Sequence, residues 1–196
     1  MNWQQQYLNI TWEDFCATTS TLSQKITRSA KKFDLIVAIA RGGLTLAQLM
    51  SDHLSLPIAA FTVQSYKDFK QASIPHIVYG LDTRLTGKKI LLLDDVSDTG
   101  KTFLRSLIYL EELGARKVDI TTAALHLKPH STYVPDFYVT KTSAWIVYPY
   151  EVCETIVQLG PLWQKTGISR EQIKHRFLTF GFATQTINMY LKKIGV

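Results

Sequence analysis

The sequence contains little cysteine and no long apolar segment. Only two of its 196 residues are cysteines, Cys16 and Cys153, and neither has a cysteine or histidine at the spacing of a zinc site. No segment approaches the roughly 18 apolar residues of a membrane-spanning helix, and the first residues lack the pattern of a secretion signal. These absences argue against a disulfide-stapled scaffold and a zinc site. We expect a soluble protein of the reducing cytoplasm, with no membrane partner.

The composition is that of a chain that can bury a core. Hydrophobic residues make up 46% of the sequence and charged residues 19%, which excludes a disordered protein. A length of 196 residues suits one domain with at most a small appendage.

Acidic residues are scarce toward the end of the chain. The formal net charge is +6, and residues 152–196 hold six Lys or Arg against two Glu, which places +4 of it in this tail. The basic residues are scattered among apolar ones, a pattern typical of amphipathic helices whose charged face is exposed to solvent. We expect about three short helices in this tail, with Ser169 as an N-cap. We do not expect a nucleic-acid partner. Alternative roles for the tail are capping the active site, a dimer contact or nucleic-acid binding.

Short apolar strands alternate with helical segments along the chain. The patterns predict helices over 11–30, 44–54 and 101–113, and strands over 34–40, 58–65, 77–81, 89–93, 118–125, 137–140 and 145–148. Continuous apolar strands between helices indicate a mostly parallel sheet covered on both faces. Ligands of such sheets bind beyond the carboxyl ends of the strands, where two glycine-containing loops follow.

The most informative segment is ILLLDDVSDTGKT, residues 90–102. Its three carboxylates, Asp94, Asp95 and Asp98, would repel one another, which favours a cation, sugar hydroxyls or a shared proton. The next residues open a helix, whose free N–H groups favour a phosphate. The final GKT also ends the nucleotide P-loop motif, but Asp95 stands where that motif requires its first glycine, which argues against a P-loop.

This segment resembles the phosphoribosyl pyrophosphate (PRPP) signature of type I phosphoribosyltransferases: aliphatics, Asp-Asp, two variable residues, Asp-Thr-Gly, one variable residue, Thr. The resemblance extends from about residue 11 to 151. It implies a phosphoribosyltransferase domain over 1–151 and a helical C-terminal extension over 152–196. The implied fold is α/β, a mostly parallel twisted sheet flanked by helices with a small hood. The implied cofactor is Mg²⁺, the ligands are PRPP and a purine base, and the assembly is a homodimer or homotetramer.

The resemblance implies roles for the residues that match the family's loops. Asp94 and Asp95 would hold the ribose hydroxyls and the metal, and Asp98 would be the general base toward the purine N7 proton. The residues implied to bind the 5′-phosphate are Ser97, Thr99, Gly100, Lys101 and Thr102. Those implied to bind the pyrophosphate are Arg41, Gly42 and Gly43. The hood loop would begin at Ser65, Tyr66 and Lys67.

A second resemblance concerns the base. Lys128-Pro129 and the later WIVYPYE, residues 145–151, resemble the base-binding part of 6-oxopurine enzymes, especially the bacterial and archaeal xanthine-guanine group. The resemblance implies that Lys128 donates to the purine O6, Trp145 stacks on the ring and the Ile146 backbone contacts the base edge. Glu151 would approach the metal or the purine 2-substituent. An ammonium offers only donors, which suits O6 and disfavours the amine of adenine.

The sequence therefore predicts a purine salvage enzyme that transfers the phosphoribosyl group of PRPP to hypoxanthine or guanine, with xanthine a further candidate. The alternative is a PRPP-sensing regulator that binds nucleic acid through its basic tail. Asp98, Lys128 and Trp145 favour the enzyme, because a sensor of PRPP alone has less need of a base pocket.

Overall fold

A computed structural model of the protein describes residues 3–65 and 75–196. The chain forms two compact units. The larger unit is Cys16–Ser143, and the smaller unit combines Met1–Phe15 with Ala144–Val196. Within the described ranges, every helix is too short or too polar to cross a membrane.

A six-stranded sheet with the order β4-β3-β2-β5-β6-β7 forms the centre of the larger unit. All neighbouring strands run parallel except β3 and β4, which are antiparallel. The predicted mostly parallel α/β fold is therefore confirmed. The strands are β2 (Leu35–Ala40), β3 (Ile58–Ser65), β4 (Pro75–Tyr79), β5 (Ile90–Ser97), β6 (Ile120–Leu127) and β7 (Phe137–Lys141).

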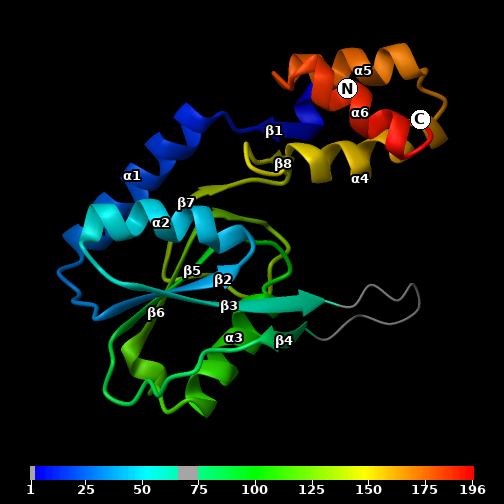
Figure 1. Ribbon diagram of the computed structural model, residues 1–196. Helices are drawn as coiled ribbons and strands as arrows, with labels where there is room; N and C mark the ends of the chain where they lie inside the picture. The colour runs from blue at the N-terminus through cyan, green and yellow to red at the C-terminus, as the bar shows by residue number, and fades with distance from the viewer. Residues whose placement is uncertain (1–2, 66–74) are drawn as a thin grey trace. The chain divides into compact units, whose positions relative to one another are not determined.

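Helices cover both faces of this sheet (Figure 1). The helices of this part of the chain are α1 (Trp12–Arg28), α2 (Gly42–Leu54) and α3 (Lys101–Glu112). Successive strand residues point to opposite faces. On one face, Val37 of β2 and Leu92 of β5 share a buried core with Phe103 and Leu110 of α3. On the other face, α2 packs on β2 and β5. Burial on both faces explains why these strands read as unbroken apolar runs.

The structure differs from the prediction at several strands. β5 continues through residues 94–97, which the sequence assigned to the loop, and β4 begins and ends two residues earlier than predicted. The predicted strand 145–148 is β8 (Trp145–Val147), but it pairs with β1 (Tyr7–Asn9) in a separate two-stranded parallel sheet. Sequence patterns missed β1 because three residues after a short 3-10 helix, η1 (Trp3–Gln6), show no period. The start of β6 is also later than predicted, because the preceding residues form a second 3-10 helix, η2 (Lys117–Asp119).

Three helices, α4 (Val152–Lys165), α5 (Arg170–Thr179) and α6 (Thr184–Lys193), make up most of the smaller unit. Ser169 is the N-cap of α5 in a full capping box with Gln172, as the sequence predicted. The helices share one apolar core with Val147 of β8; its other buried residues are Ile156, Leu159, Trp163, Ile173, Phe177, Phe182, Ile187, Leu191 and Val196. The domain boundary after Glu151 stays a prediction.

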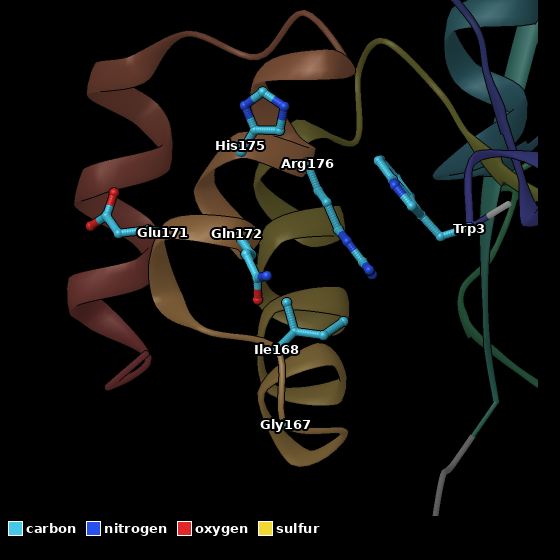
Figure 2. Close-up of a pocket in the computed structure, with 7 residues that line it drawn as sticks. All are labelled: Trp3, Gly167, Ile168, Glu171, Gln172, His175 and Arg176. Carbon is cyan, nitrogen blue, oxygen red and sulfur yellow. The ribbon is translucent and has the colours of Figure 1, made fainter.

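Aromatic side chains join the N-terminal segment to these helices. The indole N–H of Trp163 donates a hydrogen bond to the Tyr7 hydroxyl at 2.9 Å. The Arg176 guanidinium lies over the rings of Trp3 and Trp163, 4.6 and 5.1 Å from their centres. Figure 2 shows Arg176 extending toward Trp3 at a pocket of about 480 Å³, whose lining residues are Trp3, Gly167, Ile168, Glu171, Gln172, His175 and Arg176. The pocket contains none of the sequence-predicted site residues.

We predict that Trp163→Ala destabilises the smaller unit by roughly 3–5 kcal/mol, because it removes a large buried ring and its hydrogen bond to Tyr7. Urea unfolding followed by circular dichroism measures the loss. The matched control is Leu162→Ala, since the neighbouring Leu162 side chain is 49% exposed. Equal losses in the two variants would contradict the packing described for Trp163.

Candidate active site

The loops singled out by the sequence follow three neighbouring parallel strands. Arg41 follows β2, Asp94 and Asp95 lie near the end of β5, and Lys128 follows β6. The carboxyl ends of parallel strands lie along the same edge of a sheet, which is where ligands of open α/β sheets bind. The structure therefore brings the predicted pyrophosphate, ribose and phosphate loops to one edge of the larger unit, with Lys128 beside them.

The first turn of α2 packs unusually closely on the end of β5. A Cβ atom on Gly43 would lie 2.5 Å from the backbone oxygen of Leu93, and one on Gly42 would lie 2.5 Å from a carboxylate oxygen of Asp95. Any other residue at either position would have to displace the strand or the carboxylate. Both glycines are therefore required for this approach. The peptide bond between Ala40 and Arg41 is cis, and the Arg41 side chain is exposed.

Two buried carboxylates, those of Asp94 and Asp95, lie at this point of the sheet. Asp94 and Asp95 are only 9% and 6% exposed, and Asp94 Oδ1 accepts a hydrogen bond from the Asp95 amide at 3.0 Å. In residues 3–65 and 75–196, no group of three or more His, Cys, Asp or Glu side chains gathers as a metal site. Mg²⁺ binds through one or two carboxylates together with substrate oxygens and water. The residues present therefore fit the implied Mg²⁺.

The phosphate loop opens α3. Gly100 is the N-cap of α3 with φ of +83°, in the left-handed region that glycine adopts without strain. Thr99 Oγ1 accepts a hydrogen bond from the Lys101 amide at 3.4 Å. Asp98, Thr99 and Lys101 are exposed. The result is a helix N-terminus with hydroxyl and amide donors and a lysine beside it, which suits a phosphate group.

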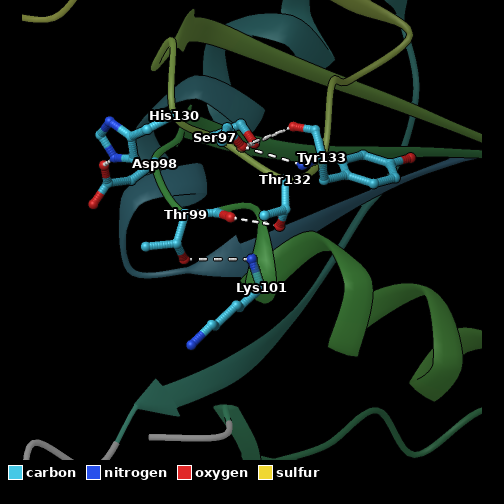
Figure 3. Close-up of polar contacts among 8 residues, drawn as sticks. Ser97, Asp98, Thr99, Lys101, His130, Thr132 and Tyr133 are labelled. Atoms are coloured by element: carbon cyan, nitrogen blue, oxygen red, sulfur yellow. Dashed lines mark hydrogen bonds and ion pairs between the residues drawn. The ribbon is translucent and has the colours of Figure 1, made fainter. Parts of the chain in front are cut away.

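A segment that sequence reasoning missed, residues 131–133, braces this loop (Figure 3). The Ser97 hydroxyl is buried, donates to the Tyr133 carbonyl at 2.8 Å and lies 2.9 Å from the Ser131 hydroxyl. The amide and hydroxyl of Thr132 both donate to the Thr99 carbonyl, at 3.0 and 2.8 Å. These bonds set the shape of the loop, and the Ser97 hydroxyl has its hydrogen-bond partners inside the protein.

Asp98 has a partner that the sequence did not suggest. His130 Nε2 lies 3.0 Å from Asp98 Oδ1, and both side chains are more than half exposed. The backbone of Lys128 is tied to the same loop, because its amide donates to the Ser97 carbonyl at 3.0 Å. Burial lowers the pKa of the Lys128 ammonium, while the negative charge of Asp98 opposes that shift. The sequence offered one signal for this contact, since His130 comes shortly after a predicted strand whose carboxyl end lies at the same sheet edge.

The remaining predicted site residues belong to the hood loop and to the base-binding segment. Ser65 ends β3, while Tyr66 and Lys67 lie outside the described residues. The three remaining purine candidates belong to the smaller unit: Trp145 and Ile146 in β8, and Glu151 at the N-cap of α4. The Trp145 side chain is 46% exposed. The larger unit alone therefore carries the predicted phosphate, ribose and pyrophosphate loops, together with Asp98 and Lys128.

The sheet order, the carboxylate pair and the helix-opening loop define an α/β protein with a type I phosphoribosyltransferase fold. The model of the phosphoribosyl transferase domain matches residues 11–155, and the chain belongs to this family. The phosphoribosyltransferase enzyme predicted from the sequence is thereby confirmed at the family level.

Solved structures are similar to this chain over about three quarters of its length. A purine phosphoribosyltransferase from Pyrococcus horikoshii is 34% identical with a TM-score of 0.67, over 74% of this chain and 94% of that one. A Neisseria gonorrhoeae protein with bound ppGpp is 26% identical with a TM-score of 0.65, over 76% and 90%. A Helicobacter pylori xanthine-guanine-hypoxanthine phosphoribosyltransferase shares the fold at 22% identity and a TM-score of 0.64, over 78% and 99%.

The histidine that precedes Lys128 on β6 makes stability depend on pH. His126 is buried, and desolvation together with the positive charge of Lys128 lowers the pKa of its imidazole from 6.5 to about 4. Between these values the unfolded chain binds a proton that the folded protein does not. The free energy of unfolding therefore falls as the pH drops below about 6.5, by on the order of 3 kcal/mol once pH 4 is reached.

We expect His126→Gln to remove most of that decline, because glutamine does not titrate. Urea unfolding at several pH values between 7 and 4 measures the slope for each protein. His53→Gln, at an exposed histidine on α2, is the control and should keep the wild-type slope. If His126→Gln declines as steeply as the wild type, the buried neutral imidazole is not the cause.

Proposed function

We propose that the protein transfers the 5-phosphoribosyl group of PRPP to a 6-oxopurine, which gives the nucleoside monophosphate and pyrophosphate. Hypoxanthine and guanine are the bases proposed first, with xanthine as a third candidate. The proposal also keeps the predicted homodimer or homotetramer and the cytoplasmic location.

The observation that carries the proposal is that Lys128, through its amide, is bonded to the same loop that carries the Asp98 carboxylate. Lys128 and Asp98 are close enough for the carboxylate to act on the pKa of the ammonium, and Lys128 is tied through its amide to Ser97. An ammonium donates hydrogen bonds and accepts none, so it favours a base with a carbonyl at C6 over one with an amine. A carboxylate near the same base can accept the proton that ring attack releases.

The phosphate loop would fix the sugar relative to the base. The residues proposed to hold the 5′-phosphate are Ser97, Thr99, Gly100, Lys101 and Thr102. Ser97 also holds the loop in shape, because its buried hydroxyl contacts the Ser131 hydroxyl and the Tyr133 carbonyl. Binding at the phosphate end is remote from the reacting carbon, so it serves to align the sugar with the base.

The reaction breaks the bond between ribose C1 and pyrophosphate and forms one between C1 and the purine N9. Negative charge develops on the leaving pyrophosphate, where Arg41 and the amides of Gly42 and Gly43 would stabilise it. The N7 proton of the base passes to Asp98, so that the product base is neutral.

Asp94 and Asp95 would hold the ribose hydroxyls and Mg²⁺. When bound, the ion would supply positive charge for the diphosphate oxygens of PRPP. Because Gly42 has no side chain, the Asp95 carboxylate can occupy the space next to it at the end of the sheet. Trp145, Ile146 and Glu151 keep their proposed roles as purine contacts.

The comparisons support a purine as the acceptor, because the Pyrococcus horikoshii enzyme at 34% identity is a purine phosphoribosyltransferase. The alternative function is a PRPP-sensing regulator that binds nucleic acid. The two functions differ in one observable, the consumption of a free base.

We predict that purified protein with Mg²⁺ and PRPP consumes hypoxanthine and guanine but not adenine, uracil or orotate, as followed by absorbance. Asp98→Asn should lower the rate by about 10²–10⁴-fold, because the general base is lost. PRPP binding, measured by calorimetry, should persist in this variant.

The matched control is Asp82→Asn, at an exposed carboxylate between β4 and β5, which should leave the rate unchanged. If no base is consumed while PRPP still binds, the regulator replaces the enzyme. If adenine is the preferred base, the assignment of Lys128 to O6 is wrong.

We further predict that His130 positions the Asp98 carboxylate for proton transfer. Loss of the contact in His130→Ala should lower kcat roughly fivefold, the effect of about one exposed hydrogen bond to a charged group, with little change in the KM for PRPP. His130→Gln keeps an N–H donor and should restore part of kcat. Steady-state kinetics of the two variants provide the measurement. Equal losses in both, or a loss that appears only in KM, would contradict a positioning role.

A further inference from the structure

The connection between the last two helices, α5 and α6, has the length and the glycine that are typical of a helix-turn-helix motif. A turn of four residues, Phe180 to Ala183, joins α5 to α6 and contains Gly181 at φ of +80°. Figure 1 shows α4, α5 and α6 gathered in one cluster. Two helices joined by a turn of three or four residues with a glycine are the unit that many DNA-binding proteins use.

The turn is held rigidly by the core of the smaller unit. Phe182 is buried, and its ring stacks on Phe177 of α5 at 5.9 Å between centres. The amides of Gly181 and Phe182 donate to the carbonyls of Leu178 and Phe177, at 2.9 and 3.2 Å. Ile187 and Leu191 then bury one side of α6 in the same core. The opposite side of α6 is therefore presented to solvent in a defined orientation relative to α5.

The exposed side of α6 is polar and basic. Its exposed residues are Thr184, Gln185, Asn188, Met189, Lys192 and Lys193. Hydroxyl and amide groups can both donate to and accept from base edges, and an Asn or Gln amide matches the paired donor and acceptor of adenine in the major groove. Met189 is the one exposed large apolar side chain on this described helix, which is too little for a protein-docking surface.

The charge of this region fits a polyanion. Residues 172–196 contain no Asp or Glu, but hold Lys174, Arg176, Lys192 and Lys193. Arg176 is partly buried against the rings of Trp3 and Trp163. Lys192 and Lys193 are both exposed, and the Lys193 ammonium lies 5.6 Å from the centre of the Tyr190 ring on the same helix, so these two lysines are the cations proposed for phosphates. An acid-free polar helix face with two terminal lysines provides both parts of DNA recognition, phosphate contacts and base-edge contacts.

Against the expectation from the sequence that nucleic acid is not a partner, we propose that α6 is a recognition helix that enters the major groove of double-stranded DNA. Gln185 and Asn188 contact base edges, and Lys192 and Lys193 contact phosphates. A-form RNA has a major groove too deep and narrow for a helix, which makes duplex DNA the fitting partner. This DNA-binding function does not rest on the proposed reaction, because its residues lie outside the loops at the strand ends of the larger unit.

The test uses the full-length protein and a fluorescent DNA duplex of about 20 base pairs, roughly two helical turns. Binding by anisotropy is titrated from about 50 to 200 mM salt. We expect binding that weakens steeply with salt. Lys192→Gln/Lys193→Gln should bind about tenfold more weakly, with a salt slope shallower by roughly two. The control Lys88→Gln/Lys117→Gln removes the same charge from exposed positions of the larger unit and should bind as the wild type does.

Sequence preference is tested by selection from a random duplex pool. Gln185→Ala/Asn188→Ala should bind the selected sequence about tenfold more weakly, while its binding to random duplex stays unchanged. All variants are also assayed for phosphoribosyl transfer and for melting temperature. DNA binding without base consumption would contradict the proposed enzyme but not the DNA-binding proposal. Base consumption without DNA binding would contradict only the DNA-binding proposal.

Three results would overturn the assignment of α6. They are no binding at the lowest salt, equal weakening by the two lysine pairs, and binding of duplex RNA as tight as that of DNA. The third would point to general affinity for phosphates instead of a helix in the major groove.

Discussion

Close contact between backbone segments around the end of β5 is the constraint on which the candidate active site depends. Gly42 and Gly43 let the first turn of α2 approach Leu93 and Asp95, and Gly100 lets the start of α3 approach the segment that contains Tyr133. A side chain at any of these three positions would push the loops apart. The buried carboxylates, the phosphate loop and the start of α2 therefore occupy one small region at the sheet edge.

Hydrogen bonds between distant parts of the chain then determine the shape of the phosphate loop. Ser97 and Thr99 are bonded to residues more than thirty positions later, and Asp98 contacts His130 in the same way. A loop organised before its ligand arrives does not lose conformational entropy on binding, which strengthens both binding and alignment. The exposed Asp98 carboxylate is held by a neighbour and is not left free to rotate.

The smaller unit is organised differently, around aromatic rings. Trp163 contacts Tyr7 and Phe177, and Arg176 stacks on Trp3 and Trp163. This core joins the first residues of the chain to the last helices. With Ile187 and Leu191 directed into it, α6 keeps its amides and lysines on the outside. The burial of these apolar residues thus determines the orientation of α6, and it leaves the polar and basic residues of the helix exposed to solvent.

Local signals in the sequence were enough to predict the main sheet, its helices and the loop after β2, because apolar runs and glycines act within a few residues. The same held for the Ser169 cap. Local signals placed the start of the loop after β5 four residues too early, because Asp94 and Asp95 are carboxylates inside the strand. Pairing of β1 with β8 could not be predicted, since three-residue strands have no period and their partners lie far apart in the chain.

The sequence by itself determined the fold class, the family and the positions of Asp94, Asp95 and Gly100. Only the tertiary structure decided that His130 contacts Asp98, that Ser97 is turned toward Ser131 and Tyr133, and which face of α6 is exposed. The physical reason is that these features arise from contacts between residues distant in the chain, which no local pattern encodes.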